Sequence, residues 1–182
     1  MRLILLNGAA LLALSACDDM SHPTAANAAP LADAATPANA TPTDARGYIA
    51  MAGAGDQFEI QSSQLALTRS RNDAVRQFAQ MMTSDHNQTT QQLTAAATAA
   101  GLTPPPPMLM PMQQDMLAQL QGLSGADFDR AYAGMQVQAH QMALALHQNY
   151  AVSGDTAQLR PVAKATAALV KQHLQMAQGL RA

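Results

Sequence analysis

The stretch NDAVRQFAQMMTSDHNQTTQQLTAAATAAG, residues 72–101, predicts the fold class of this chain. It begins with asparagine, which favours helix N-termini, and ends with glycine, which favours the position just after a helix. Between them, apolar residues recur at alternating steps of four and three, the spacing of one helix face. These residues are Val75, Ala79, Met82, Leu93, Ala96 and Ala100. So narrow an apolar face is typical of a helix inside a bundle.

Three further long helices are expected around this stretch, over residues 44–70, 125–152 and 155–180. Ser124 and Asp127 have the spacing of a capping signal for the third long helix. Its predicted inner face consists of Phe128, Tyr132, Met135, Ala139, Met142 and Leu146. The inner face of the fourth helix is expected to include Met176. Pro161 leaves the start of that helix open, because proline either begins a helix or kinks it.

Connection lengths predict the topology. Short turns join the first long helix to the second and the third to the fourth. The second and third are separated by a longer segment, in which Pro104–Pro107 forbid helix and residues 113–120 form a short helix. Two hairpins joined by one long crossover are the ferritin-like arrangement of a four-helix bundle. We therefore expect an all-α, ferritin-like bundle domain over residues 44–182.

The first seventeen residues have the features of a bacterial lipoprotein signal. Arg2 precedes an apolar run from Leu3 to Ala13, which is too short to span a bilayer as a mature helix. Leu14-Ser15-Ala16-Cys17 then resembles the lipobox, in which the cysteine is lipidated and becomes the mature N-terminus. We expect residues 1–16 to be a removed signal peptide and Cys17 to anchor the protein to a membrane.

Residues 17–43 are rich in Ala, Pro, Thr and Asn and poor in large apolar side chains. A segment of this composition buries too little surface to offset its ordering entropy, so we interpret it as a disordered tether. Asp18 and Asp19 resemble an inner-membrane retention signal of enteric bacteria. That rule does not hold in all bacteria. The predicted location is the periplasmic face of a bacterial membrane, with the inner and outer membranes both open.

Composition excludes several functions. Cys17 is the only cysteine, so a lipidated chain has no thiol for a disulfide, a thiolate metal site or a nucleophile. The net charge is −2 and the basic residues are scattered, which argues against a nucleic-acid partner. Nucleotide-binding loops and hydrolase or metalloprotease motifs are absent from the sequence, so we assign no catalytic residue.

Each long helix carries one potential metal ligand near its middle: Glu59, His86, His140 and His173. His86 and His173 interrupt apolar helix faces, and Glu59 is the only glutamate in the chain. At about 1.5 Å per residue, Glu59 and His86 differ in level by roughly 4–5 Å. The mismatch between His140 and His173 is roughly 7 Å, which is tolerable only if Pro161 delays the fourth helix.

Two interpretations of these four residues remain open. Imidazole and carboxylate groups together suit zinc, iron, copper or manganese, with Asp85 and His147 as orienting neighbours. The alternative is a polar layer that sets the bundle register without any metal. A ferritin-type di-iron centre requires several glutamates, whereas this chain has one.

Methionines in the crossover form a second candidate site. Met108, Met110, Met112 and Met116 offer thioethers, which are soft ligands suited to Cu(I). Methionine also fills gaps between packed elements, and it is abundant throughout this chain. Both interpretations of the crossover methionines therefore stay open.

Motifs in all four long helices resemble one known family. They are GDQFEI at 55–60, FAQMM at 78–82 with Asp85 and His86, FDRAY at 128–132 with His140, and His173-Leu174. In combination they resemble the ferritin-like exported bacterial proteins called domain of unknown function 4142. The resemblance implies the four-helix bundle, with Glu59, Asp85, His86, His140 and His173 at its motif positions. It implies no activity, because the family has no established one.

The leading hypothesis is therefore a lipid-anchored, non-enzymatic envelope protein that contributes to envelope structure, stress tolerance or assembly through a protein partner. The alternative is a metal-binding bundle that uses the four central side chains. Neither hypothesis specifies the oligomeric state or the identity of the ion.

Overall fold

The structure is a computed structural model that describes residues 41–180 of the 182-residue chain. The predicted signal peptide, Cys17 and the tether up to residue 40 lie outside the described residues. Five helices follow in order: α1 (Ala45–Arg69), α2 (Asp73–Ala99), α3 (Pro111–Gln121), α4 (Gly125–Ser153) and α5 (Leu159–Gly179). A search of the described helices finds none that combines the length and hydropathy required to cross a membrane.

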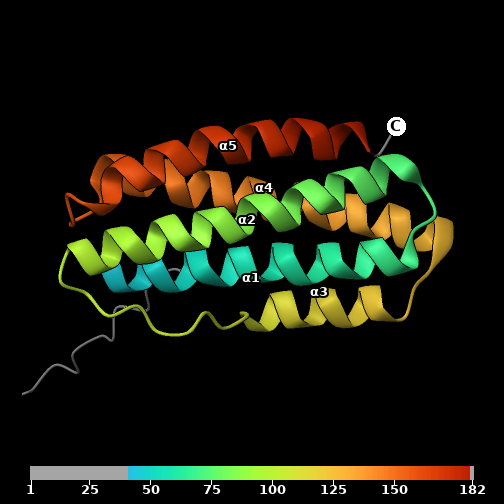
Figure 1. Cartoon of the computed structure of the whole chain (residues 1–182), viewed down its shortest axis with the longest axis horizontal. Coiled ribbons are helices and arrows are strands. Elements are labelled where there is room, and N and C mark those ends of the chain that lie inside the picture. Colours follow the sequence, from blue (N-terminus) through green and yellow to red (C-terminus); the bar gives the residue numbers. More distant parts are fainter. Residues whose placement is uncertain (1–40, 181–182) are drawn as a thin grey trace, which may run out of the picture. The chain divides into compact units, whose positions relative to one another are not determined.

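The four long helices form a bundle of two antiparallel hairpins (Figure 1). α1 pairs with α2 and α4 pairs with α5, while α1 also contacts α4 and α2 also contacts α5. Between the hairpins, the chain returns along the length of the bundle and carries α3 on the outside of α1 and α4 (Figure 1). The predicted all-α bundle is thus confirmed, and its two hairpins and crossover are those expected.

Helix ends follow the local sequence signals with one exception. The Asn72 side chain accepts a hydrogen bond of 2.9 Å from the Ala74 backbone, and Gly101 after α2 has a φ of 75° that favours glycine. The capping signal predicted for Ser124 is wrong, because the Ser124 side chain caps no backbone group of α4. Asp127, its expected partner, is paired with Arg130 instead.

Pro161 is the third residue of α5 and therefore lies in its first turn. The first turn tolerates proline, because its backbone N–H groups have no partner within the helix. Of the two possibilities left open by the sequence, the structure has the later helix start. α5 begins at Leu159 rather than at Asp155, whose carboxylate accepts hydrogen bonds from Tyr150 and Thr156.

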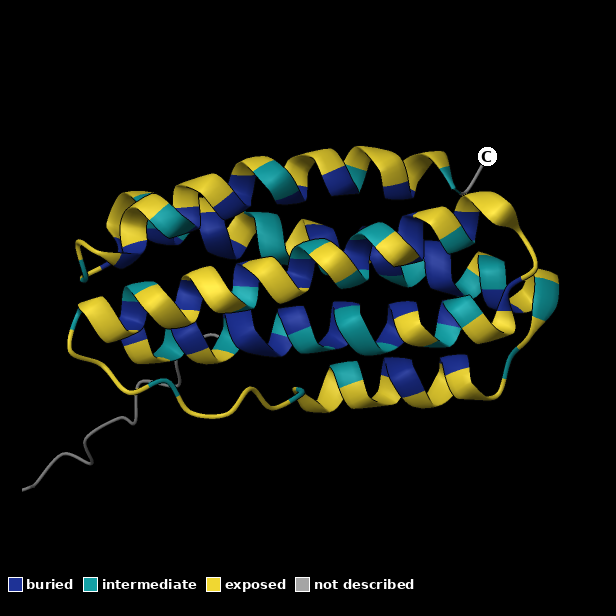
Figure 2. Ribbon diagram, in the orientation of Figure 1, coloured by how far each residue is buried: buried dark blue, intermediate teal, exposed yellow. Residues whose placement is uncertain are grey.

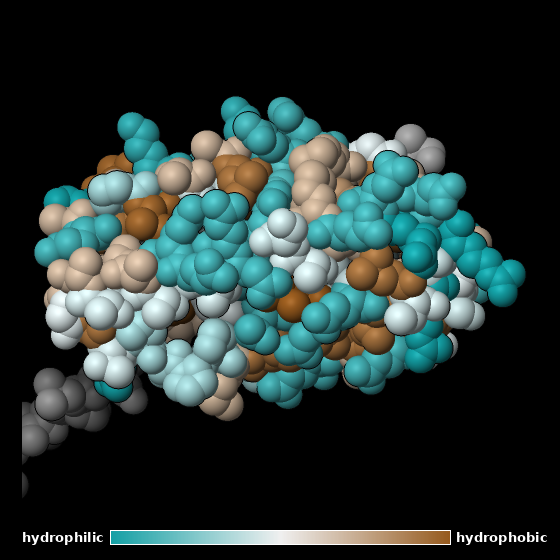
Figure 3. Space-filling model, viewed as in Figure 1, coloured by the Kyte–Doolittle hydropathy of each residue, from teal (hydrophilic) through white to brown (hydrophobic). Residues whose placement is uncertain are grey.

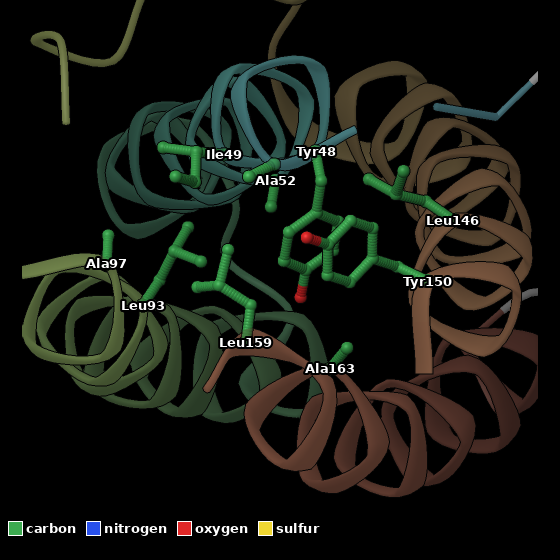
Figure 4. Packing of buried hydrophobic residues seen from close by; sticks show 10 residues of the cluster. Tyr48, Ile49, Ala52, Leu93, Ala97, Leu146, Tyr150, Leu159 and Ala163 are labelled. Atoms are coloured by element: carbon green, nitrogen blue, oxygen red, sulfur yellow. The ribbon is translucent and has the colours of Figure 1, made fainter. Parts of the chain in front are cut away.

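Two apolar clusters fill the two ends of the bundle. In the first, the rings of Tyr48 and Tyr150 stack with centroids 3.8 Å apart beside Leu93 and Leu159 (Figure 4). The second cluster consists mainly of Val75, Phe78, Ala79, Met82, Leu120, Phe128 and Tyr132. Figure 2 shows that the buried residues of the long helices lie on their inner sides. The middle of the bundle, between the two clusters, is where the polar residues discussed below are buried.

Phe128, Tyr132 and Leu146 are buried as predicted, but the middle of the inner face of α4 is rotated from the predicted one. Gln136, Val137 and His140 are buried, whereas the Met142 side chain, expected inside, is 42% exposed. Met176 on α5 is also exposed, by 40%, because Val170, His173 and Ala177 occupy the inner face. On the surface in view in Figure 3, apolar residues appear as separate small areas among hydrophilic ones.

The last residues of the predicted tether contact the bundle. The Thr43 carbonyl accepts a hydrogen bond of 2.9 Å from the Asp155 backbone in the α4–α5 turn. The Thr41 carbonyl accepts one of 3.3 Å from the Asn149 side chain. The chain is therefore attached to the bundle for a few residues before α1 begins.

Candidate metal centre

Three histidines meet in the middle of the bundle. His86 of α2, His140 of α4 and His173 of α5 are each at most 3% exposed. One ring nitrogen from each lies within 4.8 Å of the others, and the ring centroids are 5.5–5.7 Å apart. The later start of α5 brings His173 to the level of His140, which removes the mismatch that the sequence indicated.

Asp56 of α1 orients His86. The Nδ1 atom of His86 lies 2.8 Å from Oδ1 of Asp56, an acceptor, so Nδ1 carries the hydrogen. The Thr89 hydroxyl donates to the same carboxylate oxygen, and the Thr90 hydroxyl donates to the other. Asp56 is therefore held on both oxygens, and it fixes the orientation of the His86 ring.

His140 and His173 are oriented in the same manner by other acceptors. The Nδ1 atom of His140 lies 2.8 Å from the backbone carbonyl of Gln136, which can only accept. The Nε2 atom of His173 lies 3.0 Å from Oδ2 of Asp85. The His140 ring thus donates an N–H to a backbone carbonyl, and the His173 ring donates one to a carboxylate.

The second nitrogen of each ring has no hydrogen-bond partner within residues 41–180. These atoms are Nε2 of His86, Nε2 of His140 and Nδ1 of His173. Buried polar atoms are nearly always paired, so three such atoms in one place require an explanation. In a neutral imidazole with one N–H committed to an acceptor, the other nitrogen carries a lone pair. When all three rings are neutral, the cluster therefore presents three lone pairs inside the bundle.

Glu59 lies beside this cluster rather than in it. Its Oε1 atom is 3.6 Å from Nδ1 of His140, the outward-facing nitrogen of that ring. Its Oε2 atom is buried and has no partner among the described residues. The group of mutually close ligand atoms consists of the three histidines alone. The four-residue convergence predicted from the sequence is thus reduced to three, with Glu59 as a neighbour.

The electrostatics of the site depend on burial and on three nearby carboxylates. Burial raises the pKa of Glu59 to about 7 and lowers the pKa of His140 to about 3 and that of His173 to about 4. Burial also opposes the charged form of His86, but the Asp56 hydrogen bond and the charges of Glu59 and Asp85 outweigh it and raise its pKa. The three nearby carboxylates therefore favour a positive charge at the centre.

The two residues predicted to orient the ligands have different positions. Asp85 hydrogen-bonds His173, as an orienting residue would. His147 is buried, but it is paired with the Tyr48 hydroxyl at 3.0 Å and does not belong to the histidine cluster. Burial lowers the pKa of His147 to about 4.

Sequence analysis did not identify Asp56 and Gln136 as site residues. Asp56 lies three residues before Glu59 and Gln136 four residues before His140, so each shares a helix face with a predicted ligand. That spacing was the available signal for both. The pairing of Asp56 with His86 nevertheless crosses from α1 to α2 and requires the tertiary structure.

Comparisons with solved structures identify bundles of the same fold. A DUF305 fragment from Deinococcus radiodurans has a TM-score of 0.67 and 17% identity, over 78% of this chain and 97% of that one. CopM in its Cu(II)-bound form has a TM-score of 0.64 and 16% identity, over 76% and 95% of the two chains. CopM in its Ag-bound form has a TM-score of 0.60 and 14% identity, over 75% and 93%. At these identities the likeness concerns the fold alone.

Comparison with curated proteins yields no match. The family model of the domain of unknown function DUF4142 matches residues 28–180, which include the whole bundle and all the residues of the histidine cluster. The match agrees with the resemblance seen in the helix motifs. The chain belongs to the DUF4142 family.

Proposed function

We propose that this protein binds a transition-metal ion between His86, His140 and His173. One observation carries the proposal: each histidine has one nitrogen hydrogen-bonded outward and the other unpartnered within the described bundle. Metal-binding histidines have this arrangement, because the outward N–H bond fixes the ring and leaves a lone pair for the ion. The acceptors are two carboxylates and a backbone carbonyl, which are the usual partners of such rings.

A metal-free polar layer explains the arrangement less well. In such a layer, buried polar atoms pair with one another, since each unpaired atom costs about 1–3 kcal/mol. Here one nitrogen of each ring, Oε2 of Glu59 and Oε1 of Gln136 have no partner within the described part of the chain. A cation would pair with the lone pairs and would be balanced by Asp56, Glu59 and Asp85.

The spacing suits an ion after a small movement. In tetrahedral zinc sites with bonds of about 2.0–2.1 Å, ligand nitrogens are about 3.4 Å apart. One ring nitrogen of each histidine lies within 4.8 Å of the other two, so side-chain movements of about 1 Å would close the site. Glu59 lies beside His140 and adds a carboxylate next to the three histidines.

Nitrogen-rich sites of this kind favour Cu(II) and Zn(II) among the divalent first-row ions. The similarity to CopM supports this choice, because CopM has been solved with Cu(II) and with Ag bound. We propose Cu(II) or Zn(II) as the ion, held by three histidines with Glu59 available beside them.

The sequence supports an envelope location for this metal site. The signal over residues 1–16 and the lipobox cysteine Cys17 would export the chain and anchor it to the periplasmic face of a membrane. We propose that the protein holds its ion at that membrane without catalysing a reaction, alone or with an envelope protein partner. The variant Cys17→Ser tests the anchor, because the protein should then no longer be found in the membrane fraction.

Metal titration of the purified full-length protein tests the proposed site. We expect one equivalent of Zn²⁺ or Cu²⁺ to bind, to raise the melting temperature, and to bind at least about tenfold more weakly to His140→Ala. His147→Gln is the matched control, because it changes a buried histidine outside the cluster. If the parent binds no stoichiometric metal, or if His140→Ala binds metal as tightly as His147→Gln does, the centre is a polar layer and the proposal is wrong.

A further inference from the structure

A cavity of about 60 Å³ lies between α1, α3 and α4 and is partly open to the surface. Its inner wall includes Glu59, His86 and His140, so it reaches the proposed metal centre from one side. Asp56 and His147 also line it. The cavity is large enough for an ion or a few water molecules.

Methionines dominate the outer part of this cavity. Five of the twelve methionines in the chain line it: Met51, Met110, Met112, Met116 and Met142. They come from α1, from α3 and the residue before it, and from α4, so the tertiary structure gathers them from three parts of the chain. Met110, Met112 and Met142 are 38–42% exposed, whereas Met116 is 7% exposed. Thioether groups thus extend from the surface to the buried side of the cavity.

Gap filling accounts for Met51 and Met116, which pack against apolar clusters, but not for the other three methionines. A gap-filling side chain is buried between packed elements, whereas Met110, Met112 and Met142 are among the most exposed large apolar residues of the described chain. The Met112 sulfur lies 4.0 Å from the Gln138 side-chain nitrogen, which donates to it. This sulfur therefore contacts an exposed polar side chain rather than an apolar core.

We propose that the methionine-lined cavity is a second metal site, which binds a soft monovalent ion, Cu(I), through thioether sulfurs. Thioethers select Cu(I), whereas imidazole and carboxylate groups suit divalent ions, so the two ends of the cavity differ in preference. Met110, Met112 and Met142 capture the ion at the surface, and Met116 holds it on the inner side. Thioether binding in this cavity does not depend on the divalent-ion site proposed above.

Silver ion is the probe for this site, because Ag⁺ is a soft monovalent ion that stays monovalent in air. The experiment uses the full-length chain with Cys17→Ser, so that no thiol competes, and follows the methionine methyl resonances by NMR. One equivalent of Ag⁺ should shift the Met110, Met112 and Met142 resonances. The Met176 resonance should stay in place, because Met176 is 40% exposed on α5 and does not line the cavity.

The variant Met110→Leu/Met112→Leu/Met142→Leu keeps the volume and removes the sulfurs, a change that folded proteins tolerate. Its affinity for Ag⁺ should fall at least tenfold, with Zn²⁺ binding unchanged and Met176→Leu as the matched control. His140→Ala should retain the Ag⁺-induced methyl shifts while losing Zn²⁺. If the triple variant binds Ag⁺ as the parent does, or if Met176 shifts equally, the thioether site does not exist. Methionine-dependent Ag⁺ binding without any Zn²⁺ binding would support this site and contradict the proposed function.

Discussion

At the scale of single residues, Asp56 links α1 to the centre through its hydrogen bonds to α2. Its two oxygens accept hydrogen bonds from His86, Thr89 and Thr90, all of α2. A carboxylate is the only side chain with enough acceptor capacity for three donors and with a charge that favours cationic His86. Orienting groups of this kind determine ligand tautomer and basicity.

Asp56→Asn should therefore weaken metal binding by about 10–100-fold, because the amide has one acceptor oxygen and no charge. It should also lower the pKa of His86, which the Asp56 hydrogen bond helps to raise. Isothermal titration with Zn²⁺ and NMR titration of the histidine resonances measure the two effects. Asp127→Asn, on the exposed start of α4, is the control and should change neither. Unchanged Zn²⁺ affinity in Asp56→Asn would rule out an orienting role.

Glu59→Gln should change the pH dependence of stability in the metal-free protein. The pKa of Glu59 is raised from 4.5 to about 7 in the folded state, so its stabilising contribution is present below pH 4.5 and is lost as the pH rises through 7. The neutral glutamine removes that loss. Compared with the parent, the variant should gain stability at pH 8 relative to pH 5.5, as measured by urea unfolding at both values. If the stability of the variant and that of the parent changed equally between the two pH values, the raised pKa of Glu59 would be contradicted.

At the scale of elements, the α4–α5 turn sets the level of His173. Gly154 ends α4, and a Cβ atom built there would lie 2.5 Å from the Tyr150 ring and 2.6 Å from the Tyr150 carbonyl. The backbone therefore approaches itself too closely for a side chain. In this turn, the Asp155 backbone also donates a hydrogen bond to the Thr43 carbonyl. The start of α5, and with it the position of His173, depends on this tight packing.

Gly154→Ala should destabilise the fold by about 1–3 kcal/mol, the usual cost of forcing atoms into a packed region. It should also weaken Zn²⁺ binding, because α5 would shift relative to α4. Gly134→Ala is the matched control: a Cβ atom there meets nothing within 4 Å, so the variant should be more stable by about 0.5–1 kcal/mol. Denaturant unfolding and metal titration of the two variants show whether the loss of stability and of Zn²⁺ affinity comes from the tight turn or from the introduction of alanine in general. Equal stability of the two variants would show that the turn is not tightly packed.

At the scale of the whole molecule, the bundle has its polar groups at the centre and its apolar clusters at the ends. Tyr48 and Tyr150 occupy one end, while Phe128 and Tyr132 occupy the other. The two ends shield the middle from water along the bundle axis, while the methionine-lined cavity reaches it from one side. Protonation of the buried histidines therefore affects both the stability of the fold and its affinity for metal.

The metal-free protein should lose stability on acidification from pH 6.5 towards 4. The pKa values of His140, His147 and His173 are lowered from 6.5 to about 3, 4 and 4, so their contribution is present above pH 6.5 and is lost as the pH falls. Glu59, between pH 4.5 and 7, and His86, whose raised pKa favours stability below pH 6.5, act in the opposite direction, but they are two groups against three. Melting temperatures measured from pH 4 to 8 test this sign.

A bound divalent ion should oppose this acid destabilisation as long as it remains bound. At a free concentration of about 100 times the dissociation constant, it adds about 2.7 kcal/mol to the stability of the folded state. Binding should weaken as the pH falls, because protons compete for the histidine nitrogens. If the melting temperature were independent of pH between 4 and 6.5, the three histidines would not be buried in neutral form.

The sequence by itself determined the helices, their pairing and the presence of a central polar group in each long helix. These properties depend on local spacing: a helix face repeats along the chain, and a short turn makes its neighbours antiparallel. His86 and His173 were recognisable because they interrupt apolar faces at helical spacing.

The tertiary structure alone decided which of these groups meet and which atoms they present. The rotation of α4 placed His140 inside and left Met142 exposed, and the start of α5 brought His173 to the same level. The partners of the rings, such as Asp56 and the Gln136 carbonyl, then set which nitrogens remain free. Small differences in rotation and level depend on how all the helices pack together, so they cannot be obtained from the periodicity of any single helix.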